Sequence, residues 1–283
     1  EQSAFERWKM RYADLLGYVD TRQKDLFGID DEEADEDIIP EELLEAAEKP
    51  DRETFDIPQM LSESLQDLDQ LAEFLDELRQ FKPQHDDKLR ALIHLLKTDA
   101  VLKKHKVLIF SEFQATARYL ASELEKAGIK GIDQVDSATK RNRGDVIRQF
   151  APYYNGLSSK DLAEKGWAET RILIATDVLS EGLNLQDATR LINYDLHWNP
   201  VRLMQRIGRV DRRMNPAIEK RLVKDHPEVK AIRGTVEFWN FLPPDELDEL
   251  LRLYQRVAHK TLRISKVFGI EGRKLLRPDD EYD

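Results

Sequence analysis

The sequence contains no cysteine, which excludes disulfides, thiol chemistry and cysteine-based zinc sites. Its six histidines show no spacing typical of metal ligands, such as H-E-x-x-H, so no resident metal is expected. No apolar run reaches the roughly 20 residues that a membrane-spanning helix needs, and no secretory signal opens the chain. These absences predict an intracellular protein without membrane contact, and they leave association with the nucleoid open.

A phosphate-binding loop is also missing. None of the twelve glycines is followed by lysine, which excludes the G-x-x-x-x-G-K-[ST] pattern within this chain. Asp31-Glu32-Glu33 imitates an acid pair that holds magnesium, but no phosphate loop precedes it, and we interpret it as part of an acidic loop. The first residue is Glu1 rather than methionine, so the chain is expected to be a piece of a longer protein.

The charge is unevenly distributed along the chain. The formal net charge is -11, from 44 Lys and Arg against 55 Asp and Glu. Acidic residues concentrate in 30–77, whereas residues 199–224 are markedly basic. Because the local field governs binding and steering, the net charge does not exclude a polyanionic partner.

Residues 1–85 are predicted to be a helical and acidic region. An amphipathic helix over 1–29 is followed by an acidic, proline-punctuated stretch over 30–58, which is too charged to bury much apolar surface. Leucines then recur at three-four spacing over 61–78, which predicts a helix that packs on one side; a dimeric coiled coil is disfavoured because the pattern is short. We expect the acidic stretch to be regulatory, occupying basic surface of the same protein or contacting a protein partner.

Residues 86–243 are predicted to form an α/β domain, followed by a C-terminal helix and tail over 244–283. The short β-rich runs are 107–111, 131–135, 171–176, 190–195 and 235–242. The helices between and around them are expected at 86–104, 113–127, 139–150 and 200–213. Apolar strands alternating with helices indicate a parallel sheet with helices on both faces, in which ligands gather at the carboxyl ends of the strands.

An arginine-rich segment concentrates positive charge near the end of the domain. Asn199 and Pro200 favour a helix start there, and on a helical wheel Leu203, Met204, Ile207 and Val210 share one face. The opposite face gathers Gln205, Arg202, Arg206, Arg209, Arg212 and Arg213. A same-sign cluster repels itself unless an external anion lies against it, and the planar guanidinium suits phosphate. A merely solvated basic face is the alternative.

Polar residues follow two of the predicted strands. Ser111 is expected to be an N-cap with Gln114 completing a capping box, and the helix start could hold a phosphate, although capping alone explains it equally well. The strand over 171–176 ends in a hydroxyl and a carboxylate. In the loop that follows, Gly182 permits close backbone approach, and Asn184 could bond a sugar hydroxyl.

Taken together, these segments resemble the second RecA-like lobe of superfamily 2 helicases, specifically Swi/Snf-like ATPases of the bacterial type near the RNA-polymerase-recycling ATPases. Residues 106–111 look like motif IV, 175–186 like motif V, and Gln205-x-x-Gly208-Arg209-x-x-Arg212 like motif VI. Tyr194-Asp195-Leu196-His197-Trp198-Asn199-Pro200 is similar to the segment before motif VI. Two departures are the bulky Val178-Leu179-Ser180 and Met214-Asn215-Pro216 in place of Ile-Gly-Gln.

The resemblance implies roles for the matched positions. It implies that Arg209 and Arg212 are arginine fingers and that Gln205 positions the γ-phosphate or the attacking water. The residues implied on the nucleotide side are Asp177, Gly182 and Asn184. The residues implied on the nucleic-acid backbone are Ser111, Thr176, Thr139 and Arg143.

The function implied is the C-terminal lobe of an ATP-dependent translocase on double-stranded DNA. ATP with magnesium would be bound mainly by an N-terminal RecA-like lobe of the same protein, so this chain alone is expected to be inactive. No hairpin with an aromatic tip is evident between residues 106 and 243, which favours translocation without strand separation. The alternatives are an RNA-unwinding helicase lobe and a non-catalytic protein-interaction module, and the arginine face argues against the latter.

Overall fold

The computed structural model describes residues 2–27, 56–136, 141–176, 184–195, 200–241 and 275–276. The chain divides into two compact units, Glu1–His85 and Asp86–Asp283. Within the described residues, no helix combines the length and apolarity that crossing a membrane requires. The acidic stretch and most of the C-terminal tail lie outside the described residues.

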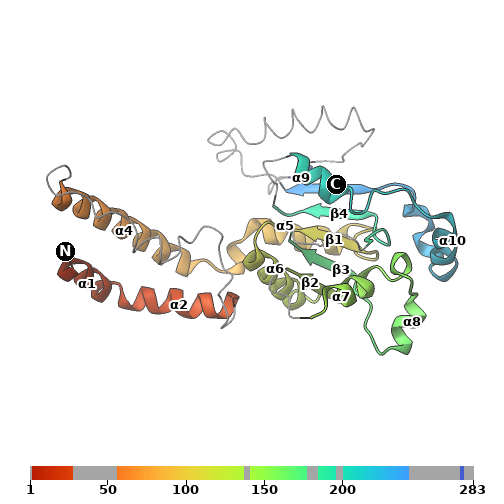
Figure 1. Cartoon of the computed structure of the whole chain (residues 1–283), viewed down its shortest axis with the longest axis horizontal. Coiled ribbons are helices and arrows are strands. Elements are labelled where there is room, and N and C mark those ends of the chain that lie inside the picture. The colour runs from red at the N-terminus through yellow and green to blue at the C-terminus, as the bar shows by residue number, and fades with distance from the viewer. Residues whose placement is uncertain are drawn as a thin grey trace, which may run out of the picture. The chain divides into compact units, whose positions relative to one another are not determined.

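The first unit consists of helices that run in the same direction. Its elements are α1 (Gln2–Arg11), α2 (Ala13–Phe27), α4 (Ile57–Gln80) and the short 3-10 helix η1 (Pro83–His85). The Trp8 indole donates to Asp69 at 3.0 Å, and Arg79 lies over the Tyr18 ring at 5.4 Å. Because the contacts advance along both segments together, α1 and α2 are parallel to α4 (Figure 1).

Helix α4 confirms the helix predicted from the leucine pattern, but it buries less than expected. Asp56 caps it by accepting a hydrogen bond from the Gln59 amide at 3.1 Å. Ala72 is its one buried side chain among the described residues, and Leu78 of the predicted stripe is exposed. The helix predicted over 1–29 is broken at Tyr12 into two pieces.

The second unit is built on one parallel sheet with strand order β2-β3-β1-β4-β5-β6. The strands are β1 (Val107–Phe110), β2 (Ile132–Val135), β3 (Ile172–Ala175), β4 (Arg190–Asn193), β5 (Glu237–Phe241) and β6 (Leu275–Leu276). Every residue of β1, β3 and β4 is buried, as continuous apolar strands covered on both faces should be. The five predicted strands are confirmed, each slightly shorter than expected.

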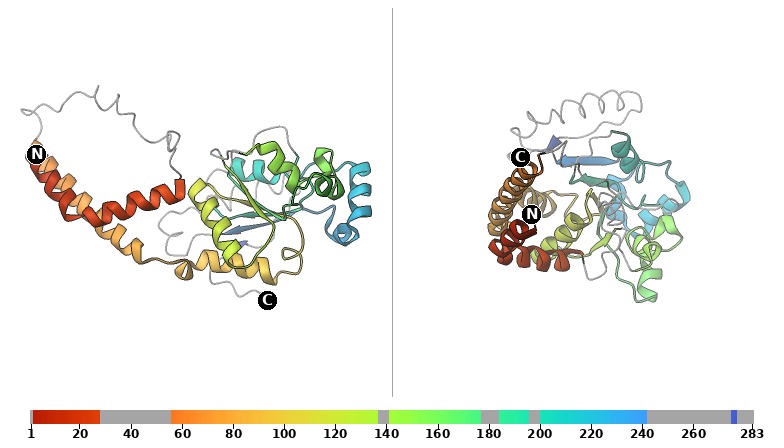
Figure 2. Two further views of the ribbon diagram at one scale, coloured as in Figure 1. Left: turned by 90° about the horizontal axis from the view of Figure 1, so that it is seen from below. Right: turned by 60° about the vertical axis from the view of Figure 1, so that its left-hand side comes forward.

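Helices cover both faces of this sheet (Figure 2). They are α5 (Asp87–Thr98), α6 (Gln114–Lys126), α7 (Arg143–Phe150), α8 (Ser159–Glu164), α9 (Pro200–Ile207) and α10 (Pro216–Asp225), with 3-10 helices η2 (Tyr153–Asn155) and η3 (Pro227–Ile232). Successive strand residues point to opposite faces, so Ile109, Ile174 and Ile192 pack with α5 and α6. Leu108, Leu173 and Leu191 pack with α7 and α9 on the other face. The predicted α/β layering is confirmed.

The helix predicted over 200–213 is too long, because α9 ends at Ile207. Gly208 follows it, and a Cβ there would lie 3.1 Å from the Met204 carbonyl oxygen. The Arg209 and Val210 amides then donate to carbonyls three residues back, at 3.1 and 3.0 Å, which tightens the chain into a turn. Arg212 and Arg213 therefore lie on a loop rather than on a helical face.

Candidate nucleotide and nucleic-acid site

Polar residues gather where the central strands end. Ser111 follows β1, Thr176 follows β3, and Tyr194-Asp195 follow β4, so the parallel arrangement brings all of them to the carboxyl edge of the sheet (Figure 1). Arg206 of the following helix reaches the same edge, because its guanidinium donates to the Asp195 carbonyl. Ligands of parallel α/β sheets bind at this edge.

The Asp195 carboxylate joins three segments at this edge. It accepts hydrogen bonds from the Ser111 hydroxyl at 2.6 Å and the Glu112 amide at 3.1 Å, and the Lys88 ammonium lies 2.9 Å away. Burial by itself would raise the pKa of Asp195, but Lys88 and the hydrogen bonds outweigh burial and hold the pKa below its usual range. Asp195 is therefore ionised at neutral pH and fixes β1, β4 and α5 to one another.

The capping box predicted at Ser111 is wrong. The N-cap of α6 is Phe113, and no side chain caps that helix. The Ser111 hydroxyl instead donates to the charged acceptor Asp195, because a charge-assisted hydrogen bond is stronger than a neutral one. Its side chain has no exposed surface, so a contact between Ser111 and nucleic acid stays a prediction that this conformation does not display.

The other predicted nucleic-acid residues are only partly described. Thr176 is buried, and its hydroxyl has no hydrogen-bond partner within the residues described here. Arg143 is half-buried at the first position of α7, after the N-cap Asn142. Thr139 lies outside the described residues, as do Asp177 and Gly182 on the nucleotide side.

The apolar face predicted for α9 is confirmed, but one arginine was assigned to the wrong side. Leu203, Ile207 and Val210 are buried. Arg206 is only 2% exposed; its guanidinium donates to the Asp195 carbonyl at 2.9 Å and lies 5.3 Å from the centre of the Phe110 ring. On the helical wheel Arg206 is only roughly 60° from Leu203, and a carbonyl and an aromatic ring make its burial tolerable. Arg206 is therefore a structural residue.

The remaining cations form an arginine loop, defined here as Gly208–Asn215. Arg209 is half-buried, whereas Arg212, Arg213 and the preceding Gln205 are exposed. In the described part of the chain no carboxylate forms an ion pair with Arg209, Arg212 or Arg213. Among the described residues, these three guanidiniums therefore lack a counterion.

The structure brings together Arg212 and Asn184, which are 28 residues apart. The Arg212 guanidinium donates to the Asn184 amide oxygen at 3.3 Å and, through Nε, to the Gly208 carbonyl at 3.1 Å. The sequence pattern placed one of these residues with the nucleotide phosphates and the other with its ribose. Their contact is the geometric feature expected if both face one ligand.

Several residues that support this loop were missed. Gln186 donates to the carbonyls of Arg212 and Arg213 at 3.2 and 3.4 Å, and Arg233 pairs with Glu219 at 2.5 Å. Tyr154 donates to the same Glu219 at 2.6 Å. Gln186 lies within the predicted motif V, but no signal in the sequence pairs Tyr154, Glu219 and Arg233.

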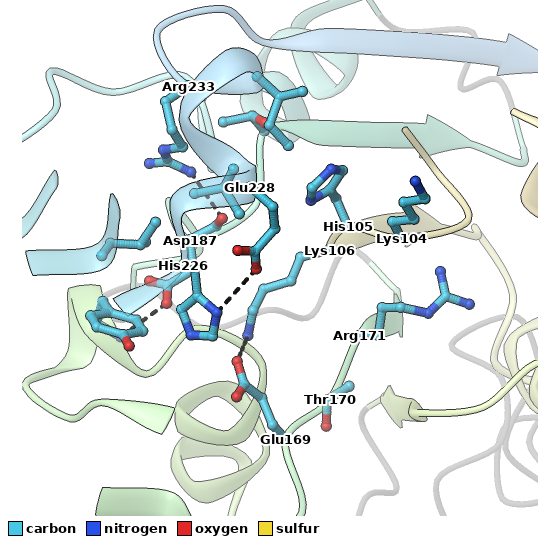
Figure 3. A pocket seen from close by; sticks show the side chains of 15 residues that line it. Lys104, His105, Lys106, Glu169, Thr170, Arg171, Asp187, His226, Glu228 and Arg233 are labelled. Atoms are coloured by element: carbon cyan, nitrogen blue, oxygen red, sulfur yellow. Dashed lines mark hydrogen bonds and ion pairs between the residues drawn. The ribbon is translucent and has the colours of Figure 1, made fainter. Parts of the chain in front are cut away.

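A cavity of about 280 Å³ lies at the opposite, amino-terminal edge of the sheet (Figure 3). Three of its cations have protein partners: Lys106 pairs with Glu169 at 2.7 Å, Arg171 donates to the Leu102 carbonyl at 2.8 Å, and Arg233 to the Asp187 carbonyl at 2.9 Å. Burial lowers the pKa of His105, which disfavours its cationic form. The cavity is therefore poorly suited to a polyanion.

Comparison with known proteins assigns this domain. Residues 87–214 match the family model of the helicase conserved C-terminal domain. This segment is therefore similar to a helicase C-terminal domain. The resemblance to superfamily 2 helicases predicted from the motifs is thereby confirmed, and so is the RecA-like parallel sheet.

Three relatives of the helicase domain illustrate its range. The chain is 40% identical over 107 residues to an uncharacterized ATP-dependent helicase, YqhH, of Bacillus subtilis, covering 38% of the chain and 16% of that protein. It is 29% identical over 177 residues to DEAD-box ATP-dependent RNA helicase 10 of Arabidopsis thaliana, covering 62% and 36%. It is 32% identical over 130 residues to the RNA polymerase-associated protein RapA of Vibrio vulnificus, covering 46% and 12%. The chain thus spans little more than a third, or less, of each relative.

Proposed function

We propose that this chain is the C-terminal lobe of an ATP-dependent nucleic-acid translocase and that Arg209 and Arg212 are its arginine fingers. Gln205, exposed on the last turn of α9, positions the γ-phosphate or the attacking water. The observation that carries the proposal is the arginine loop, whose arginines have no carboxylate partner among the described residues and whose Arg212 contacts Asn184.

The chemistry of phosphoryl transfer supports these roles. Negative charge spreads over the γ-phosphoryl oxygens in the transition state, and a guanidinium placed against them accelerates the reaction by roughly 10³ to 10⁵. Arg206 is excluded from this role because it is buried on Phe110. Arg209 and Arg212, beyond the helix end, keep their guanidiniums accessible.

The rest of the nucleotide site fits a ligand shared with a second lobe. Asn184, with Asp177 and Gly182, contributes the ribose side. We propose that magnesium is held mainly by the N-terminal lobe. When bound, ATP with magnesium supplies the transferable phosphoryl group, and this lobe contributes positive charge and orientation.

The nucleic-acid backbone is held at the carboxyl edge of the sheet. Thr176 and Arg143, with Thr139, contact phosphates, and Ser111 contributes by fixing Asp195 and the backbone of Glu112. Contacts of this kind carry no sequence preference. The lobe therefore grips nucleic acid by its backbone rather than reading bases.

Phosphate release tests the division of labour between two lobes. The 283-residue chain, with or without DNA, is expected to show no turnover, whereas the full-length protein hydrolyses ATP. Binding of a fluorescent ATP analogue to the chain alone is expected to be weak. Turnover by pure chain that survives Arg209→Ala would contradict the proposal.

Double-stranded DNA is the nucleic acid that we propose, and RNA unwinding is the second candidate because one relative is named as an RNA helicase. The two candidates separate on paired substrates for the full-length protein. We expect displacement of a triplex-forming strand without unwinding of a forked duplex. Unwinding of the fork or of an RNA duplex without triplex displacement would favour the second candidate.

A further inference from the structure

Six residues form a ring of hydrogen bonds that begins and ends at Arg212. On one side, the Arg212 guanidinium donates to Asn184 at 3.3 Å, and the Asn184 amide donates to the Tyr154 carbonyl at 3.4 Å. On the other side, the Gln186 amide donates to the Arg212 carbonyl at 3.2 Å. These three links are long, so each is individually weak.

The ring is closed by Tyr154, Glu219 and Arg233, which make much shorter links. The Tyr154 hydroxyl donates to Glu219 at 2.6 Å, and Arg233 donates to both carboxylate oxygens of Glu219 at 2.5 and 2.8 Å. Arg233 also donates to the Gln186 carbonyl at 2.7 Å. Charge-assisted, bidentate pairs of this kind are the strong and directional hydrogen bonds of proteins.

The protonation states favour this arrangement at neutral pH. Burial by itself would raise the pKa of Glu219, but hydrogen bonds from Arg233 and Tyr154 outweigh it and leave the pKa lowered. Burial and the Glu219 carboxylate raise the pKa of Tyr154 to about 12, so its hydroxyl keeps the proton that it donates. Glu219 is thus an anion that organises a cation and a hydroxyl around itself.

The same group of residues reaches the arginine loop at its far end. The Tyr154 hydroxyl accepts a hydrogen bond from the Asn215 amide at 3.1 Å. Asn215 is also the N-cap of α10, accepting from the Ala217 amide at 3.0 Å. The loop backbone is therefore held at Arg212 and Arg213 through Gln186, and at Asn215 through Tyr154.

We propose that Tyr154, Glu219 and Arg233 are positioning residues that fix the backbone of the arginine loop for the chemical step. The inference rests on the proposed role of Arg212 in ATP hydrolysis. Short bonds hold Tyr154, Glu219, Arg233 and the Gln186 carbonyl together, and the Tyr154 hydroxyl and the Gln186 amide contact the loop backbone at three points. The Arg212 guanidinium has a single bond to Asn184, at 3.3 Å, so it can leave Asn184 for a phosphate while these backbone contacts remain. Fixing the backbone in advance reduces the reorganisation that the reaction requires.

Tyr154→Phe tests the proposal because it removes one hydroxyl and little volume. In the full-length protein we expect kcat to fall by about 10- to 100-fold, since a misplaced catalytic group costs that much, while KM for ATP and nucleic-acid affinity change less than about twofold. Combined with Arg212→Ala, it should add nothing further, because coupled residues are not additive. Glu219→Gln, which keeps the shape and acceptors of the side chain, should lose less than Glu219→Ala.

Tyr153→Phe is the matched control. Tyr153 is the neighbouring buried tyrosine, and its hydroxyl donates to Asp225 at 2.9 Å, outside the ring. Tyr153→Phe should leave kcat unchanged, even where it changes the melting temperature as much as Tyr154→Phe does. A fall in kcat with Tyr153→Phe equal to that with Tyr154→Phe would overturn the proposal.

Amide hydrogen exchange of the 283-residue chain gives a readout independent of ATPase activity. Tyr154→Phe should speed exchange at Asp211–Asn215, and Tyr153→Phe should not. Unchanged exchange there overturns the inference, as does faster exchange with an unchanged kcat. If Arg212→Ala leaves kcat intact, the proposed function fails, and with it the catalytic meaning of the ring, whereas the exchange result still shows whether these residues hold the loop.

Discussion

The cavity and the arginine loop differ in where space and unpaired charge are found. The amino-terminal edge has a cavity of about 280 Å³, but Lys106, Arg171 and Arg233 are bonded to protein acceptors around it. In the arginine loop, no carboxylate of the described residues pairs with Arg209 or Arg212. Positive charge around the cavity stabilises the fold, and in the loop it is left for a ligand.

This difference shows why cavity volume is a poor guide to the site of a lobe that works with a partner. An anion binds where positively charged side chains lack a counterion. The rest of such a binding site can be formed by a second lobe, so the first lobe alone need not enclose a cavity. The match to the helicase C-terminal domain and the contact between Arg212 and Asn184 both point to the arginine loop.

The largest expected effect is on kcat, and it separates the arginines of the arginine loop from those at the cavity. In the full-length protein, Arg212→Ala or Arg209→Ala should lower kcat by about 10³ or more through lost transition-state stabilisation. Arg171→Ala, at the cavity, should leave kcat within a few-fold. Steady-state ATPase assays measure both. If Arg212→Ala keeps kcat and instead reduces the salt dependence of nucleic-acid binding by about one phosphate contact, the loop binds nucleic acid rather than nucleotide.

An intermediate effect is expected from the aspartate that organises the carboxyl edge. Asp195→Asn should lower the free energy of unfolding by about 2 kcal/mol at pH 7, because it leaves the partly buried Lys88 without its anion. Asp161→Asn is the control, since Asp161 pairs with the exposed Arg221 at 3.3 Å, and such pairs contribute at most about 1 kcal/mol. Urea unfolding of the chain measures the difference, and equal losses would remove the special role of Asp195.

The pH dependence of that difference has a defined sign. The pKa of Asp195 is lowered in the folded state, so its stabilisation is present above the unfolded pKa of about 3.9 and is lost as pH falls through the folded value. The difference in the free energy of unfolding between wild type and Asp195→Asn should therefore be constant from pH 7 to about 5 and shrink at lower pH. A gap that widens on acidification would contradict the assigned ion pair.

The smallest effect is expected from the acidic stretch of the first unit. Replacing residues 30–55 by a neutral Gly-Ser segment of equal length should raise nucleic-acid affinity a few-fold at low salt and hardly at all at high salt, because screening weakens the competing negative field. The control variant keeps the same number of acidic residues in this segment but places them in a scrambled order. Affinity that is unchanged at every salt concentration would exclude autoinhibition by charge.

Periodicity and strand composition predicted the sheet well, and local competition explains what they missed. Continuous apolar runs such as Val107–Phe110 can be satisfied only inside a covered sheet, so their burial follows directly. Ser111 was misassigned because its hydroxyl bonds to Asp195, 84 residues away, which no local rule anticipates. Arg206 was misassigned because the helix ends at Ile207 and Phe110 offers a surface for its guanidinium.

The residues of the candidate site also divide into those that the sequence proposes and those that it misses. Motif spacing proposes Arg209, Arg212 and Asn184 as candidate ligand residues, and the structure brings Arg212 and Asn184 into contact. The support from Tyr154, Glu219 and Arg233 depends on contacts between α10, η2 and the chain after η3, and sequence separation hides these contacts. Motif spacing thus proposes candidate ligand residues but not the groups that hold them in place.

The parallel direction of α2 and α4 sets a minimum length for the chain that joins them. After Phe27 the chain must return along the length of α1 and α2 before α4 begins at Ile57, a path of roughly 40 Å at 1.5 Å per helical residue. At about 3.3 Å per extended residue, roughly a dozen residues are needed to cover it. Residues 28–56 exceed that requirement about twofold, so the connection tolerates shortening by half, whereas complete excision would force α4 to reverse or to detach from α1.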